Sequence, residues 1–306
     1  MALELTAILA GTVAAATPLI FAGLGELVTQ RSGVINLGVE GMMLVGAIAG
    51  FAFAAQYDAS VLSALLIGGL AGMLMALIFA FFTLSLSTNQ SACGLALTIF
   101  GLGISAFLGQ NYVSTALPGL ANFNIPLLAD LPVVGPILFQ QNYVVYLSIF
   151  AFFAVWFVLA KTRLGLLLKA VGESPESAHA MGYHVLAIRY GAVLFGGMMA
   201  GIGGAFLSTV YTPMWIENMV AGRGWIAIAL VVFAVWKPTR LILGAYLFGG
   251  VTILQFHAQA LGINVPNEFL AALPYLATIV VLVMISRDKK LLKMNLPASL
   301  GKTFVP

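Results

Sequence analysis

The run from Val61 to Leu86 is the sequence feature that most limits the fold, because it is predominantly apolar and contains no charged residue. A helix that crosses a bilayer needs about 20 mostly apolar residues, whereas a strand of an outer-membrane barrel alternates apolar and polar positions over about ten. The run therefore predicts a membrane-spanning helix and excludes a barrel strand. Only 8% of the whole chain is charged, against about a quarter of a soluble domain, so a soluble globular protein is excluded as well.

Similar apolar runs recur along the chain, separated by polar or Pro- and Gly-rich breaks. The candidate spans are residues 5–25, 33–53, 61–86, 91–109, 142–160, 190–210, 224–236, 241–260 and 268–286. We therefore predict an all-α polytopic membrane helix bundle of about nine spans, within a range of eight to ten, that forms a single transmembrane domain over residues 1–306. The bundle is predicted to consist of two loosely repeated halves with broken helices.

The charges between these runs indicate how the bundle is oriented. Segment 110–141 contains several prolines and Asp130 but no Lys or Arg, which is typical of an external loop. Lys and Arg instead gather in segments 161–189 and 287–306 and on both sides of Pro238, which predicts that these parts are cytoplasmic. Alternation of the spans then places the N-terminus outside and the C-terminus in the cytoplasm, in a multi-pass protein of the bacterial inner (plasma) membrane.

Several other classes of function are disfavoured by the residues. Basic cytoplasmic loops account for the net charge of +3, so no nucleic-acid partner is expected. His179, His184 and His257 are scattered and Cys93 is the single cysteine, so no metal site, catalytic residue or cofactor is predicted. Gly301-Lys302-Thr303 lacks the first glycine of a phosphate-binding loop and is predicted to be a solvated tail. Few ionisable residues lie in the spans, which disfavours an ion-coupled transporter, and no catalytic constellation supports an intramembrane enzyme.

Two polar interruptions precede apolar runs in the two halves of the chain. The first, from Arg31 to Gly41, contains Asn36 and Glu40, and the second extends from Pro213 to Gly224. Non-helical backbone at membrane depth is tolerated only where protein or a water-filled cavity surrounds it, and paired interruptions are typical of transport sites. Both segments are therefore predicted to be broken or re-entrant helices.

The basic segment 161–189 contains a helix-start signature at its centre. Ser174 is suited to cap the helix, Pro175 to occupy its first position and Glu176 to lie in its first turn, while Gly182 can end it. The pattern predicts a short helix between two spans with its small side chains exposed. An ordinary loop with an incidental helical turn is the alternative.

Two motifs give the chain a resemblance to a known family. The pattern Ala170-x-Gly172, with Ala178 and Gly182 behind it and a glycine-rich span after it, resembles the coupling loop of bacterial ABC importer permeases of the branched-chain amino acid, ribose and nucleoside group. The segment from Gly33 to Met43 resembles the early motif of the simple-sugar and nucleoside branch. The resemblance covers residues 7–290. It departs from the family at Ser174, Pro175 and Ser177, where many members have an Asn followed by a second small residue.

The resemblance implies the membrane subunit of an ATP-driven importer of a polar small solute. Nucleosides are favoured, and a simple sugar such as ribose is the alternative. ATP hydrolysis is then expected on separate ABC ATPase subunits, and the other expected partners are a second permease subunit, identical or different, an extracytoplasmic solute-binding protein and the lipid membrane. The residues expected to contact the ATPase are Ala170, Gly172, Glu173, Ser174, Pro175, Glu176, Ala178 and Gly182.

Roles in solute handling are predicted for the two interruptions. Asn36 and Glu40 stand four apart, on one face if the segment is helical, and an ionisable group at membrane depth is costly unless it faces a cavity or a partner. We predict that both line the substrate path; the alternative is that Glu40 pairs with Arg31 or with another subunit and fixes a broken helix. The predicted contacts with the solute-binding protein are Trp215, Glu217, Asn218 and Arg223. Interfacial anchoring is the alternative for the tryptophan.

Overall fold

The computed structural model describes residues 2–260 except 125, 127, 130 and 133, scattered positions between 269 and 283, and residues 295–305. Within these residues, seven helices are long and apolar enough to cross a membrane. They are α1 (Ala2–Arg31), α2 (Val39–Tyr57), α3 (Val61–Ala80), α4 (Gln90–Gly109), α5 (Tyr143–Lys161), α8 (Val185–Phe206) and α10 (Pro238–Ala260). The predicted all-α membrane bundle is confirmed, whereas the predicted repeat of two halves stays a prediction.

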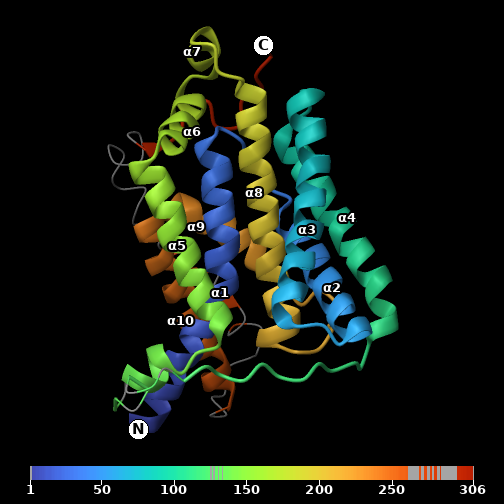
Figure 1. Ribbon diagram of the computed structural model, residues 1–306, viewed down its shortest axis with the longest axis vertical. Helices are drawn as coiled ribbons and strands as arrows, with labels where there is room; N and C mark the ends of the chain where they lie inside the picture. Colours follow the sequence, from blue (N-terminus) through green and yellow to red (C-terminus); the bar gives the residue numbers. More distant parts are fainter. Residues whose placement is uncertain are drawn as a thin grey trace.

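Shorter elements connect or extend these helices. The short α-helices are α6 (Arg163–Glu173), α7 (Pro175–Ala180) and α9 (Arg223–Phe233). Turns of π-helix at Phe81–Ser85 and Leu207–Tyr211 extend α3 and α8, a third lies at Gly135–Phe139, and a 3-10 turn at Gln110–Tyr112 follows α4. Helices α1 and α8 run through the middle of the bundle, with α5, α9 and α10 on one side and α2, α3 and α4 on the other (Figure 1). The N-terminus and α7 lie at opposite ends (Figure 1).

Small residues allow α2, α3 and α8 to cross closely at the centre of the bundle. A Cβ atom on Gly46 of α2 would lie 2.5 Å from the carbonyl oxygen of Gly201 on α8, and a Cβ on Gly201 would lie 3.0 Å from the Cα of Gly72 on α3. Close backbone approach at small residues is how membrane helices gain packing energy, since lipid supplies no hydrophobic force between them. This crossing fixes the positions of α2 and α8, whose ends carry the residues considered below.

Three predicted spans differ from the helices. Helix α1 continues past residue 25 to Arg31, because its last polar side chains are buried and bonded within the bundle. The span predicted at 33–53 begins at Val39, since residues 33–38 form a buried loop. The span predicted at 224–236 is α9, whose 11 residues extend about 16 Å, half of a bilayer core of about 30 Å. The predicted ninth span and the tail from 287 lie outside the described residues, apart from the positions given above.

Candidate functional site

Glu40 joins the two interrupted segments of the chain. It lies in the first turn of α2 and is 3% exposed. Its Oε1 atom accepts a hydrogen bond from the backbone N–H of Gly222 and its Oε2 atom from that of Gly224, each at 2.7 Å. These N–H groups stand at the start of α9, where unpaired donors and the helix dipole favour a negative charge. Glu40 thus caps a helix that begins inside the bundle, and its partner is this backbone and not Arg31.

Gly224 has a steric role in this cap. A Cβ atom there would lie 2.6 Å from the backbone nitrogen and Cα of Glu40. Gly222 adopts the left-handed conformation, with φ of 83°, just before α9 begins. Glycine at both positions therefore lets the loop before α9 turn into the carboxylate, which explains why the second interruption is rich in glycine.

Asn36 lies in the loop before α2 and is fully buried. Its Oδ1 atom accepts a hydrogen bond from the N–H of Gly38 at 2.9 Å, as in an Asx turn. Two neighbouring helices hold this loop, because Gln90 Oε1 of α4 accepts the N–H of Ile35 at 2.8 Å and Glu26 Oε1 of α1 accepts the N–H of Asn36 at 3.3 Å. Asn36 therefore lies outside α2 and does not share a helical face with Glu40, because the segment between them is not helical throughout, as the expectation from their spacing required.

Glu26 is a buried polar residue that the sequence analysis did not single out. It is 1% exposed, Gln30 Nε2 donates to its Oε1 at 2.9 Å, and Trp236 Nε1 donates to the Oε1 of Gln30 at 2.8 Å. Its second oxygen, Oε2, has no hydrogen-bond partner among the described residues. A carboxyl group directly after the first predicted span, with a glutamine four residues later, was the available signal, because an ionisable residue at membrane depth marks a functional site by default.

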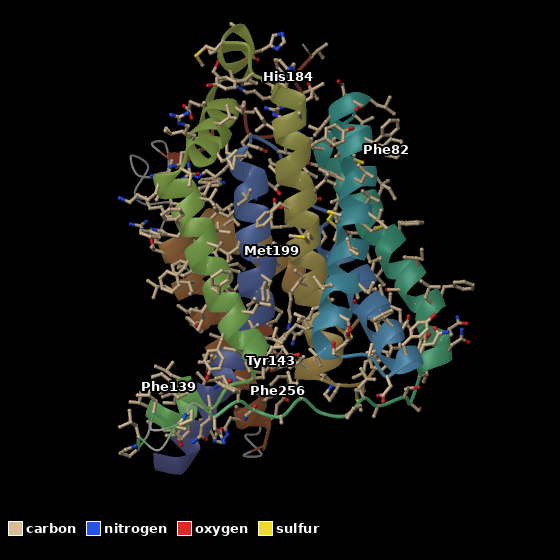
Figure 2. The ribbon with its side chains drawn as sticks, viewed as in Figure 1. Phe82, Phe139, Tyr143, His184, Met199 and Phe256 are labelled. Carbon is tan, nitrogen blue, oxygen red and sulfur yellow. The ribbon has the colours of Figure 1, made fainter. Side chains whose placement is uncertain are left out.

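The second interruption separates into buried and exposed residues. Trp215 is 5% exposed and packs against Phe51 of α2, with ring centroids 6.4 Å apart. Arg223 donates through Nη1 to the carbonyls of Met219 and Val220 at 3.1 Å. Trp215 is thus part of the core, and the exposed members of the predicted partner contact are Glu217 and Asn218. Aromatic side chains including Phe139, Tyr143 and Phe256 also gather at this end of the bundle, opposite His184 (Figure 2).

The predicted short helix in the basic segment is confirmed as α7. Ser174 Oγ accepts a hydrogen bond from the N–H of Ser177 at 3.2 Å, and Pro175 occupies the first position. Gly182 follows in the left-handed conformation with φ of 87°. Helix α6, which the sequence analysis did not separate from the loop, precedes it, and together they project from one end of the bundle (Figure 1).

Some small residues of this segment face the protein, whereas Ser177 and Ala180 are exposed, as predicted. Ala178 is 1% exposed and packs with Val171, Val185 and Phe304, so the prediction that it is exposed is wrong. Gly172 and Pro175 are buried and Ala170 is half-buried. The exposed members of the predicted set are Glu173, Glu176 and Gly182. Two apolar side chains that the sequence analysis missed, Met181 and Tyr183, are 65% and 46% exposed beside them.

Lys169 anchors α6 on the end of α5. Its Nζ atom donates to the carbonyl of Leu159 at 2.7 Å, which places a positive charge at a helix C-terminus, where the dipole favours it. Partial burial and, secondarily, the nearby charge of Arg31 lower the pKa of Lys169. The projecting segment is therefore fixed to a spanning helix at its base.

The C-terminal residues lie against this segment. Ser299 is 3% exposed and Phe304 is 7% exposed. Gly301, Lys302 and Thr303 between them are exposed, as predicted for a solvated tail, whereas the burial of these two flanking residues was not predicted. Their hydrophobic and hydrogen-bonding partners lie on α6, α7 and α8.

Comparison with known proteins agrees with this architecture. The family described as "Branched-chain amino acid transport system / permease component" matches residues 8–285. A Haloferax volcanii protein, TsgC13, provisionally named a glucose ABC transporter permease protein, is 41% identical over 97% of this chain and 97% of its own. The nucleoside ABC transporter permease protein NupC of Lactococcus lactis is 33% identical over 90% of this chain and 91% of its own. The guanosine ABC transporter permease protein NupQ of Bacillus subtilis is 33% identical over 91% of each.

The resemblance found in the two sequence motifs is confirmed by these matches. The family match includes both the Glu40 segment and the α7 segment, and the relatives align over nearly their full lengths. Because the match extends from α1 through α10, this chain belongs to the permease family of the branched-chain amino acid transport system and is a multi-pass ABC transporter permease.

Proposed function

We propose that this permease imports a neutral polar solute, a nucleoside, in a complex that hydrolyses ATP on separate ABC ATPase subunits. A second permease subunit and an extracytoplasmic solute-binding protein complete the complex in the inner membrane. The observation that carries the choice of solute is the occupation of the α9 start by Glu40, with both carboxylate oxygens hydrogen-bonded. In this proposal Asn36 and Glu40 adjoin the solute path through the loop and the half-helix that they position.

Charge is the reason for choosing a neutral solute. In transporters built from broken helices, half-helix N-termini point at the anionic groups of their substrates. Here the protein's own carboxylate already neutralises that end of α9, so a solute carboxylate or phosphate would meet a negative group. The half-buried Arg31 donates to the carbonyl of Trp236 at 2.7 Å, and the buried Arg189 donates to that of Ser32 at 3.1 Å, so both cations have acceptors within the chain. An uncharged solute avoids the desolvation of an unpaired charge.

The names of the relatives agree with a neutral solute. NupC is named for nucleosides, NupQ for guanosine and TsgC13 for glucose, and all of these are uncharged and rich in hydroxyl groups. A sugar is the second candidate for this chain, because the glucose-named relative is the most identical of the three.

The basic residues support a cytoplasmic position for α7 and the C-terminal residues. Apart from Arg223, the Lys and Arg residues that the structure describes lie toward the end that carries α7. They are Arg31, Lys161, Arg163, Lys169, Arg189, Lys237, Arg240 and Lys302. Positive residues accumulate on the cytoplasmic side of membrane proteins. Met181, Tyr183, Glu173 and Glu176 are then exposed on the side where an ATPase binds.

Uptake measurements distinguish the candidate solutes. In proteoliposomes that contain the whole complex, radiolabelled guanosine is expected to accumulate when ATP is enclosed with the ATPase, and excess guanosine monophosphate is expected not to compete. Glucose in place of guanosine tests the second candidate. Competition by the monophosphate as strong as that by unlabelled guanosine would contradict the neutral-solute proposal.

Exchange of Met181 for aspartate tests the ATPase contact. Because this side chain is 65% exposed, the substitution leaves the permease folded but places a charge in an apolar contact, and co-purification of the ATPase is expected to fall about tenfold or more, as for a buried anchor residue of an interface. Tyr57→Asp is the matched control, since Tyr57 is also 65% exposed but is the last residue of α2 and does not belong to the projecting segment. Equal ATPase recovery with both variants would show that α7 does not contribute to the ATPase contact.

A further inference from the structure

The C-terminal segment, residues 295–305, connects α6 to the loop before α2. The N–H and the Oγ of Ser299 both donate to the carbonyl of Gly172 at the end of α6, at 3.0 and 2.7 Å. Two residues later, the N–H of Gly301 donates to the carbonyl of Gly33 at 3.0 Å. Gly33 begins the buried loop that contains Asn36. The C-terminal segment therefore contacts both the end of α6, next to the proposed ATPase contact, and the loop before α2, which adjoins the proposed solute path.

Arg189 fastens the C-terminal segment to α8. It is fully buried, and its guanidinium donates to three acceptors on two chain segments: Nε to the carbonyl of Ser32 at 3.1 Å, Nη2 to Ser299 Oγ at 3.1 Å and Nη1 to the carbonyl of Lys302 at 3.2 Å. A buried cation that loses its acceptors is strongly destabilised. The C-terminal segment, α8 and the end of α1 are thus held as one unit by a single side chain.

Phe304 extends this unit beneath α7. Its ring is 7% exposed, packs in a cluster with Ala178 and Val185, and meets the ring of His179 edge-on with centroids 5.7 Å apart. Ala178 and His179 belong to α7 itself. A displacement of α7 by an ATPase therefore presses on Phe304 as well as on Val185 at the start of α8.

The loop after Gly33 continues the connection into the bundle. It is held by Gln90 and Glu26, as described above, and leads directly to Glu40. Glu40 in turn holds the start of α9. Contacts therefore run without a gap from α7 through Phe304, Ser299 and the loop to the half-helix.

We propose that the C-terminal segment transmits the displacement of α7 to the loop before α2, with Ser299, Arg189 and Phe304 as positioning residues. This inference rests on the proposed ATP-driven function. Networks of packed and hydrogen-bonded groups carry such coupling only when the elements that they join move together, and the evidence for it must be a measured change in coupling. The quantity to measure is the amount of solute transported per ATP hydrolysed.

The test compares Phe304→Ala and Ser299→Ala with Val305→Ala, whose side chain is 74% exposed next to Phe304. The complete complex is purified by size exclusion, reconstituted, and assayed for guanosine uptake and ATP hydrolysis in the same vesicles. Solute moved per ATP is expected to fall about 2- to 30-fold in the first two variants, the range seen for residues of a coupling network. Val305→Ala is expected to retain the wild-type ratio, and Phe304→Leu, which keeps an apolar side chain, to restore most of it.

The outcomes separate this inference from the proposed function. If the wild-type complex transports without hydrolysing ATP, the proposed function fails. If the wild type couples the two and Phe304→Ala keeps the wild-type ratio, the proposed function stands and the transmission role is overturned. A merely structural role would lower the yield of folded complex while leaving the ratio of the purified fraction unchanged, and this result also overturns the inference.

Discussion

Replacement of Glu40 by alanine is expected to reduce uptake at least about tenfold, because α9 loses both acceptors at its start. Hydrogen bonds to a charged group each contribute about 1.5–3 kcal/mol, and about 1.4 kcal/mol corresponds to a factor of ten. The N–H groups of the half-buried Gly222 and the buried Gly224 would lose their acceptors, since both now donate to this carboxylate. Uptake by the reconstituted complex and the midpoint of its thermal unfolding are the measurements, and both are expected to decrease.

A graded series makes this result specific for the cap. Glu40→Gln keeps one acceptor oxygen of the two and is expected to lie between the wild type and Glu40→Ala. Asp58→Asn is the control, because it neutralises an exposed carboxylate just beyond the other end of α2. Wild-type uptake by Glu40→Ala would show that the start of α9 needs no carboxylate, and equal losses in Glu40→Ala and Asp58→Asn would assign the effect to charge alone.

Replacement of Gly201 by leucine is expected to prevent assembly of the bundle. A Cβ atom at this position would already lie 3.0 Å from the Cα of Gly72 on α3, and the remaining leucine atoms would force α8 away from it. Overpacking of a well-packed core costs about 1–3 kcal/mol when neighbouring side chains can adjust, whereas here the neighbour is backbone. The amount of monodisperse protein extracted from membranes is expected to fall close to the detection limit.

Gly191→Leu provides the matched control on the same helix. It lies near the start of α8, and a Cβ atom added there meets nothing within 4 Å. Its yield is expected to equal that of the wild type. Equal yields of the two leucine variants would contradict the close crossing of α3 and α8.

Local signals in the sequence were sufficient for most of the spanning helices and for α7. Long apolar runs predict the spanning helices, and Ser174 with Pro175 predicts α7, because a helix cap is decided by residues within one turn of each other. The boundary of α1 was missed because Glu26 and Gln30 look like the end of a span. They continue the helix since each finds a buried partner.

The contacts that assemble the site could not be predicted in the same way. Glu40 and Gly222 are 182 positions apart, and hydrogen bonds from backbone N–H groups to a carboxylate leave no residue-type pattern in a sequence. The burial of Ala178 is similarly decided by Phe304, which lies beyond the last predicted span. Small residues in a predicted coupling helix indicate close approach, but not whether the approaching surface belongs to another subunit or to the same chain.

ATP-dependent uptake is the measurement that tests the central claim most directly. The purified permease, with the proposed ATPase, second permease and solute-binding protein, is reconstituted in proteoliposomes, and radiolabelled guanosine uptake is followed with ATP, without ATP, and with the Met181→Asp variant. The account predicts accumulation only with ATP and its loss in the variant. Accumulation by the permease alone, driven by an ion gradient without ATP, would contradict it.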